Sequence, residues 1–263
     1  MHQEKINALA KTLSQARVNA KPIEQLSKDH QLNITDAYAI QEEGIRFRQE
    51  NGEVTVGMKM GLTSAAKRKQ MNLESPLYGV LTDKMQVAND GVISLNGQIH
   101  PKIEPEIAFF IAKDLKGKVS EEEVLAACSG VCVALEVLDS RYTQFKYFSM
   151  EDVISDNSSS SMFILGEKIS DFKNINLSDL QMKMKINGEL VQEGNSNAIS
   201  GNPVLSVVQL CELLAEREQY LRRGQVVLAG AATAAVALEK GMTITLEVQD
   251  LSNLPVSVTV GEQ

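Results

Sequence analysis

The chain has 263 residues, with no tryptophan, 5% aromatic residues and only three cysteines. Cys128, Cys132 and Cys211 each stand inside an apolar run, which predicts small buried side chains rather than disulfide partners or metal ligands. A disulfide-stapled secreted scaffold is therefore not expected. The length is sufficient to bury a sizeable core as one domain, or as one domain with a smaller appendage.

Positive charge is in the minority, because 26 Lys and Arg residues stand against 34 Asp and Glu residues and give a net charge of -8. No basic run offsets phosphate charge, so we do not expect a nucleic-acid binder. We find no apolar run of about 18 residues and no basic-then-apolar start of the kind that marks a signal peptide. These absences predict a cytoplasmic protein that does not bind a membrane.

Several common catalytic motifs are also missing. The sequence has no Ser/His/Asp order, no cysteine nucleophile with a candidate base, no phosphate loop and no dinucleotide fingerprint. His100 has no second histidine nearby, which favours a strand-edge residue over a metal ligand. The remaining candidates for chemistry are carboxylates within predicted strands.

Glu104 and Glu106 stand two apart in an otherwise strand-like run, residues 100–110, so the period of two directs both side chains to one face. A third carboxylate, Glu136, interrupts the apolar strand predicted over 131–138. Burying unpaired carboxylates costs several kcal/mol each, unless they are protonated, paired or hold a cation. The pattern therefore predicts a site for Mg²⁺ or Mn²⁺, with a solvated strand face as the competing interpretation.

Apolar spacing over residues 4–18 and 35–51 predicts two amphipathic helices, and Thr63 with Ser64 predicts the cap of a short helix over 65–71. Most later segments alternate as strands, which indicates an α+β class with a largely β body. We expect a helical accessory region over residues 1–75 that contributes Lys59, and a β-rich, metal-binding catalytic domain over 76–263.

Three further features are candidates for substrate contacts. Lys59 projects alone from the glycine-lined face of a predicted strand, although a single strand lysine is usually exposed. The serine-rich run over 155–161 lies between apolar segments, and loops held in this way are often functional. The small-residue loop over 231–235, which contains Thr233, permits close approach of the backbone to a strand or a ligand.

Four segments, taken in order, resemble the fumarylacetoacetate hydrolase superfamily, and within it the branch of hydratases and decarboxylases of catechol meta-cleavage. They are GMKMGLTS (57–64), PKIEPE (101–106), LEVLDSRY (135–142) and DNSS (156–159). The resemblance covers nearly the whole chain. It implies a mixed, largely antiparallel β-sheet roll, like the C-terminal domain of that superfamily, with Glu104, Glu106 and Glu136 as ligands of Mg²⁺ or Mn²⁺.

The sequence of one turn distinguishes the hydratases of this branch from the decarboxylases. The hydratases carry an acidic residue in a Pro-Asp-Phe-Gly turn, where it helps to deliver water. The matching turn here is Pro76-Leu77-Tyr78-Gly79, so the resemblance implies a drier site without a general acid or base for hydration. The segment over 228–236 also resembles the decarboxylases.

The resemblance therefore implies metal-dependent decarboxylation of 2-oxohex-3-enedioate to 2-hydroxypenta-2,4-dienoate and CO₂. It implies catalytic roles for Lys59, Leu77 and Ser159, and substrate contacts from Lys59, Ser159, Ser161 and Thr233, without an organic cofactor. The alternatives are a hydratase of 2-hydroxypenta-2,4-dienoate and a non-catalytic partner subunit of that hydratase. We further expect a homo-oligomer and a complex with the hydratase, which would receive the unstable dienol directly.

Overall fold

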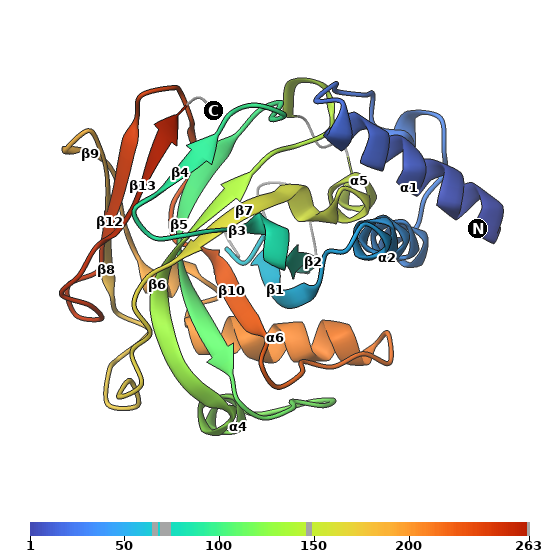
Figure 1. Cartoon of the computed structure of the whole chain (residues 1–263). Coiled ribbons are helices and arrows are strands. Elements are labelled where there is room, and N and C mark those ends of the chain that lie inside the picture. The colour runs from blue at the N-terminus through green and yellow to red at the C-terminus, as the bar shows by residue number, and fades with distance from the viewer. Residues whose placement is uncertain (65–67, 69–74, 146–148, 262–263) are drawn as a thin grey trace.

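Strands that alternate apolar and polar residues form two sheets, which make up the centre of the computed structural model (Figure 1). The structure describes residues 1–64, 68, 75–145 and 149–261. The helix expected over 65–71 lies outside the described residues, apart from residue 68.

The larger sheet has eight strands in the order β2-β1-β10-β5-β6-β7-β3, with β11 paired to β5. Its strands are β1 Thr55–Gly61, β2 Leu77–Thr82, β3 Gln86–Val87, β5 Lys102–Ile111, β6 Cys128–Leu138, β7 Ser160–Leu165, β10 Val226–Ala231 and β11 Val236–Ala237. The pairs β1/β10 and β3/β7 are parallel, and the other pairs in this sheet are antiparallel.

The smaller sheet has the order β4-β13-β12-β8-β9 and lies on one side of the molecule (Figure 1). Its strands are β4 Gly91–Ser94, β8 Gln181–Ile186, β9 Glu189–Asn195, β12 Thr243–Glu247 and β13 Val256–Gly261. Buried residues of both sheets, among them Ile107, Val133 and Val258, belong to one apolar core. The expected α+β class with a mixed, largely antiparallel roll is confirmed.

Helices lie on the outside of this roll (Figure 1). They are α1 Gln3–Val18, α2 Ile34–Glu50, α4 Glu121–Ala127, α5 Met150–Ser155 and α6 Pro203–Ala215, with short 3₁₀ turns η1 Leu26–Lys28, η2 Asp83–Met85, η3 Thr143–Phe145, η4 Asn157–Ser159 and η5 Ser196–Ala198. Side-chain caps fix several helix starts: the Asn33 side chain accepts the Asp36 N–H, and Ser120 forms a capping box with Glu123.

The two N-terminal helices pack against each other around their own apolar cluster, which contains Leu9, Leu13, Ile40 and Tyr142. The boundary expected at residue 75 falls between β1 and β2, which are hydrogen-bonded neighbours in the larger sheet. The division into an accessory region and a catalytic domain stays a prediction.

One segment, Ser196–Ala215, has the length and mean hydropathy, 1.4, of a membrane-crossing helix, which corrects the expectation that no such apolar stretch exists. In the structure this segment is not one continuous helix, because it contains η5, a turn and α6. The side chains of Val207, Leu210 and Leu214 are fully buried in the main core. We interpret α6 as a core helix of a folded domain.

The three cysteines are free and buried, as expected. Burial raises the pKa of each thiol, Cys128, Cys132 and Cys211, to about 12. A thiol that stays protonated is neither a nucleophile nor a metal ligand. The cysteines therefore act as small apolar side chains.

Candidate active site

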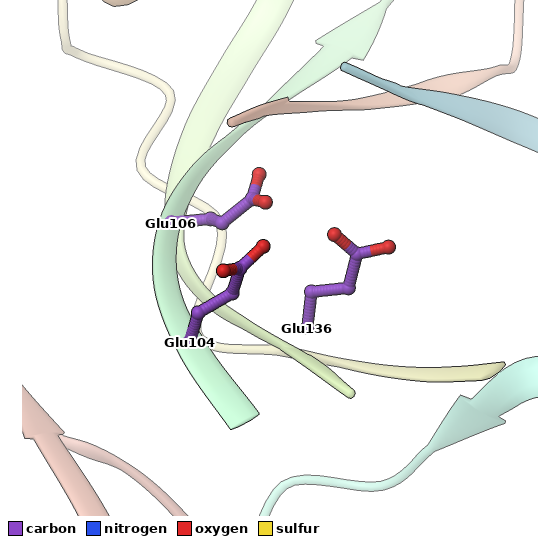
Figure 2. Close-up of side chains that lie close together, drawn as sticks. All are labelled: Glu104, Glu106 and Glu136. Carbon is purple, nitrogen blue, oxygen red and sulfur yellow. The ribbon is translucent and has the colours of Figure 1, made fainter. Parts of the chain in front are cut away.

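The register of β5 and β6 brings the three predicted carboxylates together. Glu104 of β5 pairs directly with Glu136 of β6, and Glu106 lies two residues further along β5 on the same face. One ligand oxygen from each residue lies within 4.8 Å of the others. Figure 2 shows the three carboxylates turned toward a common space.

These carboxylates are almost withdrawn from solvent, since the exposed fraction is 0% for Glu106 and Glu136 and 9% for Glu104. Burial, and then repulsion by Glu136 and Glu104, raises the pKa of Glu106 well above its ordinary value, while Lys59 and the Gly230 N–H act in the opposite direction. The Oε1 atom of Glu106 is buried and has no hydrogen-bond partner. A hard divalent cation with oxygen ligands fits this donor set, because it satisfies the unpaired oxygen and offsets the repulsion.

A single glycine orients one of these carboxylates. The N–H of Gly230 donates to Oε2 of Glu106 at 2.7 Å. Gly230 has φ +116° and lies where the register between β10 and β5 shifts. A Cβ atom at this position would lie 2.4 Å from the Thr63 hydroxyl oxygen, so both the conformation and the space require glycine.

Lys59 lies at the same site, although three strand steps separate its strand, β1, from β6 in the order of the sheet. In a flat sheet these strands would be about 14 Å apart, at about 4.8 Å for each step. The sheet curls instead, and the Lys59 ammonium lies 3.1 Å from Oε2 of Glu136. Lys59 is 2% exposed, so the interpretation of this residue as an ordinary exposed lysine does not hold.

Ser160 is a site residue that the sequence did not single out within its serine run. Its hydroxyl donates to Oε1 of Glu136 at 3.1 Å and is fully buried. With Lys59 on Oε2, this bond fixes both oxygens of Glu136. No periodicity distinguishes Ser160 from its neighbours, because the pairing of β7 with β6 is irregular beside it.

Ser161, a predicted substrate contact, lies where the pairing of β7 with β6 is irregular. Its hydroxyl donates to Gln98 Oε1 at 2.8 Å, away from the carboxylates, and Ser161 does not line the pocket beside them.

A pocket opens beside Glu104. Predicted residues that line it are Lys59, Leu77, Glu104 and Ser159, joined by residues not predicted as site residues, among them Thr63, Phe145 and Ser158. Leu77 is fully buried and gives this wall an apolar surface. The Ser159 hydroxyl is buried without a hydrogen-bond partner, which leaves it available to a ligand.

The turn that presents the serines has an unusual backbone. Asn157, Ser158 and Ser159 have positive φ angles of 49°, 55° and 57°, a conformation that is uncommon for residues other than glycine. The Asn157 side chain supports the turn by accepting the Val80 N–H at 2.8 Å and donating to the Val80 carbonyl at 2.9 Å. The turn is therefore tied to β2, the strand that carries Leu77.

Thr233, a predicted substrate contact, and His100, which was not expected to be a ligand, do not line the pocket. Thr233 donates to the carbonyl of Ala234 at 3.2 Å and packs near Gly194, while Ala231 of the same loop lines the pocket. The structure therefore does not bring Thr233 to this pocket as a substrate contact. His100 packs edge-on against Phe145, with ring centroids 6.3 Å apart, and does not join the carboxylate group.

A comparison with protein families matches residues 49–259 to the fumarylacetoacetate (FAA) hydrolase C-terminal family. The chain is 42% identical to a 4-oxalocrotonate decarboxylase from a Pseudomonas species, over 97% of this chain and 98% of the relative. It is 30% identical to a 2-hydroxyhexa-2,4-dienoate hydratase from Comamonas testosteroni, over 97% of each chain.

Among solved structures, the chain is similar to 4-oxalocrotonate decarboxylase from Pseudomonas putida G7 complexed with magnesium and adipate. The TM-score is 0.95 and the sequence identity 37%, over 99% of this chain and 98% of the other. The similarity thus extends over the whole fold, including the helical N-terminal region.

Proposed function

Because the chain belongs to the fumarylacetoacetate hydrolase family, as its sequence segments suggested, we propose that it is a decarboxylase of 2-oxohex-3-enedioate (4-oxalocrotonate). The products are 2-hydroxypenta-2,4-dienoate and CO₂. Identity to the decarboxylase, 42%, exceeds identity to the hydratase, 30%, at the same coverage of this chain. The observation that carries the proposal is a pocket in which Lys59 and Glu104 face the apolar Leu77.

Glu104, Glu106 and Glu136 are the residues that would hold a divalent cation, Mg²⁺ or Mn²⁺. A magnesium ion accompanies the decarboxylase structure from Pseudomonas putida G7, and magnesium and manganese prefer the same oxygen ligands. When bound, the cation supplies Lewis-acid stabilisation of negative charge on the 2-oxo group of the substrate.

Lys59 binds the substrate at its 2-oxo end. Cleavage of the bond between C5 and C6 releases CO₂ and leaves its electron pair in the conjugated chain, so negative charge develops on the 2-oxo oxygen. The buried ammonium of Lys59, 3.1 Å from Glu136, donates a hydrogen bond to that oxygen. This bond strengthens as the charge grows, which lowers the barrier rather than only improving substrate binding.

Leu77 and Ser159 have complementary tasks on the other wall. Leu77 lines the pocket and is buried from solvent, so it excludes the water that would add to the dienol product. The unpartnered hydroxyl of Ser159 donates to a substrate carboxylate and orients the chain of the substrate.

One assay tests the proposal. The purified chain, with Mg²⁺ and 2-oxohex-3-enedioate, should release CO₂ in step with formation of 2-hydroxypenta-2,4-dienoate. Conversion of added 2-hydroxypenta-2,4-dienoate to 4-hydroxy-2-oxopentanoate, without CO₂ release from the enedioate, would identify a hydratase. Absence of both reactions would identify a non-catalytic subunit.

We also propose that a hydratase receives the dienol in a complex with a homo-oligomer of this chain, in the cytoplasm. The buried, free thiols of Cys128, Cys132 and Cys211 fit a reducing compartment. Transfer within a complex would shorten the time that the unstable dienol spends in solution. Co-purification with the hydratase, followed by light scattering, tests both assemblies.

A further inference from the structure

A second pocket lies among α1, α2 and the segment that follows α5. Three guanidinium groups line it, from Arg17 of α1, Arg48 of α2 and Arg141 after β6. The same three arginines line the neighbouring hollow on their other side. We call the first cavity the arginine pocket. It does not share Lys59, Glu104 or Leu77 with the catalytic pocket.

The positive charge in this pocket is only partly compensated. Arg141 is paired with Asp156. Arg48 makes only long contacts, 3.5 Å to Glu53 and 3.4 Å to Thr82, and Arg17 has no side-chain hydrogen bond or ion pair within the described part of the chain. Burial and the charges of Arg17 and Arg141 lower the pKa of Arg48 to about 10, although Glu53 and Asp156 act in the opposite direction.

The rest of the lining is mixed, and its one carboxylate, Asp156, is paired with Arg141. Leu13, Ile40 and Ile45 supply the apolar surface. Two buried polar atoms of the lining have no hydrogen-bond partner. They are the hydroxyl oxygen of Ser155, a residue that is 4% exposed, and the side-chain oxygen of Gln41, a residue that is 2% exposed. Buried polar groups are normally satisfied, so these two indicate a missing ligand with polar ends.

We propose that the arginine pocket binds a small organic carboxylate at a site separate from the catalytic pocket. The guanidinium groups of Arg17 and Arg48 hold the carboxylate, since their planar forks match its two oxygens. The hydroxyl of Ser155 donates a further hydrogen bond, and Leu13 and Ile40 enclose the carbon skeleton. A bare inorganic anion would leave this apolar surface unused.

The arginine pocket and the catalytic pocket share one wall, formed by the segment over residues 156–160. Asp156, Asn157 and Ser160 line the arginine pocket, while Ser158 and Ser159 of the same segment line the catalytic pocket. The Ser160 hydroxyl donates to Glu136 at 3.1 Å. One strained turn thus forms a wall of both pockets.

Calorimetric titration of the metal-loaded protein with adipate tests the proposal. The wild-type chain should bind one more adipate than two variants, Arg17→Gln, which removes one guanidinium, and Ser14→Glu, which places a carboxylate inside the pocket. Loss of one charged hydrogen-bonding group should weaken binding at this site about tenfold or more. Lys11→Gln is the matched control, because Lys11 is an exposed residue of α1 that does not line the pocket.

Ser14→Glu separates loss of the site from loss of the fold, because a carboxylate that occupies the pocket should also raise the melting temperature. Lys59→Met should leave adipate binding in the arginine pocket unchanged. This result does not depend on which reaction the catalytic pocket performs. The proposal is overturned if Arg17→Gln and Ser14→Glu bind adipate with wild-type stoichiometry and affinity. It is also overturned if Lys11→Gln loses the same binding event.

Discussion

Glu104 and Glu136 are direct cross-strand partners on β5 and β6, an arrangement in which two like charges destabilise an antiparallel pair. Lys59 pairs with Glu136 at 3.1 Å, and a cation bound between the two carboxylates would offset their repulsion further. The sheet keeps this destabilising pair at its centre because its carboxylate oxygens, with those of Glu106, form one group of ligand atoms within 4.8 Å.

The first prediction concerns this pair. In metal-free protein, Glu104→Gln should raise the free energy of unfolding by about 1 kcal/mol, because it removes one of the facing charges. The same variant should lose the Mg²⁺-dependent rise in melting temperature, because a ligand oxygen is lost. Urea unfolding with and without Mg²⁺ measures both effects. A metal-free variant less stable than the wild type would contradict the repulsion.

The affinity of the protein for Mg²⁺ should depend on pH. The pKa of Glu106 is raised by burial and by its neighbouring carboxylates, so the proton must leave before the oxygen binds a cation. Mg²⁺ should therefore bind more tightly and raise the melting temperature more at about pH 8 than at about pH 5. Thermal unfolding over a magnesium series at each pH provides the measurement. A stabilisation that is independent of pH would refute it.

Leu77→Asp should reduce decarboxylation and admit hydration, since it places a carboxylate and water in a wall that is fully buried in the wild type. We expect formation of 4-hydroxy-2-oxopentanoate from 2-hydroxypenta-2,4-dienoate, together with a lower kcat for CO₂ release. Leu77→Asn is the control, because asparagine matches aspartate in size and polarity but has no acidic group. Unchanged decarboxylation kinetics in the Asp variant would count against water exclusion by Leu77.

Two serines form a matched pair for substrate contact. Ser159→Ala should lower kcat/KM about tenfold to a hundredfold, the cost of one hydrogen bond to a charged group. Ser161→Ala should have wild-type kinetics, because its hydroxyl donates to Gln98 and Ser161 does not line the pocket. Steady-state assays of both variants decide the matter, and equal effects would show that Ser159 has no specific contact.

The buried pair of Asp156 and Arg141 gives a pH prediction for stability. Burial raises the pKa of Asp156 to about 6, against an ordinary value of 3.8, although Arg141 lowers it. The folded state therefore holds a proton that the unfolded state releases between these values, so this group's contribution to stability falls as pH rises from 3.8 to 6.

The difference in unfolding free energy between wild type and Asp156→Asn isolates this effect. It should shrink by about 3 kcal/mol across that window, at about 1.36 kcal/mol for each pH unit, and stay constant above it. Urea unfolding of both proteins at several pH values provides the test. A constant difference would mean that Asp156 keeps its ordinary pKa in the fold.

Local periodicity was sufficient to predict the carboxylate group. The period of two placed Glu104 and Glu106 on one face, and the apolar strand around Glu136 identified the third carboxylate. It was not sufficient for Ser160, because the pairing of β7 with β6 is irregular beside this residue. The ligand orientation by Gly230 was also hidden, since it arises from a register shift between strands distant in sequence.

The apolar segment Ser196–Ala215 illustrates a different limit. Its composition alone resembles a membrane helix, and only its burial against the sheets reveals a core helix. Likewise, the exposure of Lys59 could not be judged from its own strand, because the curl of the whole sheet determines what lies above it.

The curl of the larger sheet also has a consequence for the order of folding. β1 pairs in parallel with β10, where Lys59 lies beside Leu228, so closing this part of the roll joins segments that are far apart in the chain. Such long-range pairing is slow and is completed only after local structure has formed. The contact between Lys59 and Glu136 therefore forms late in folding, whereas Glu104, Glu106 and Glu136 come together when the neighbouring strands β5 and β6 pair.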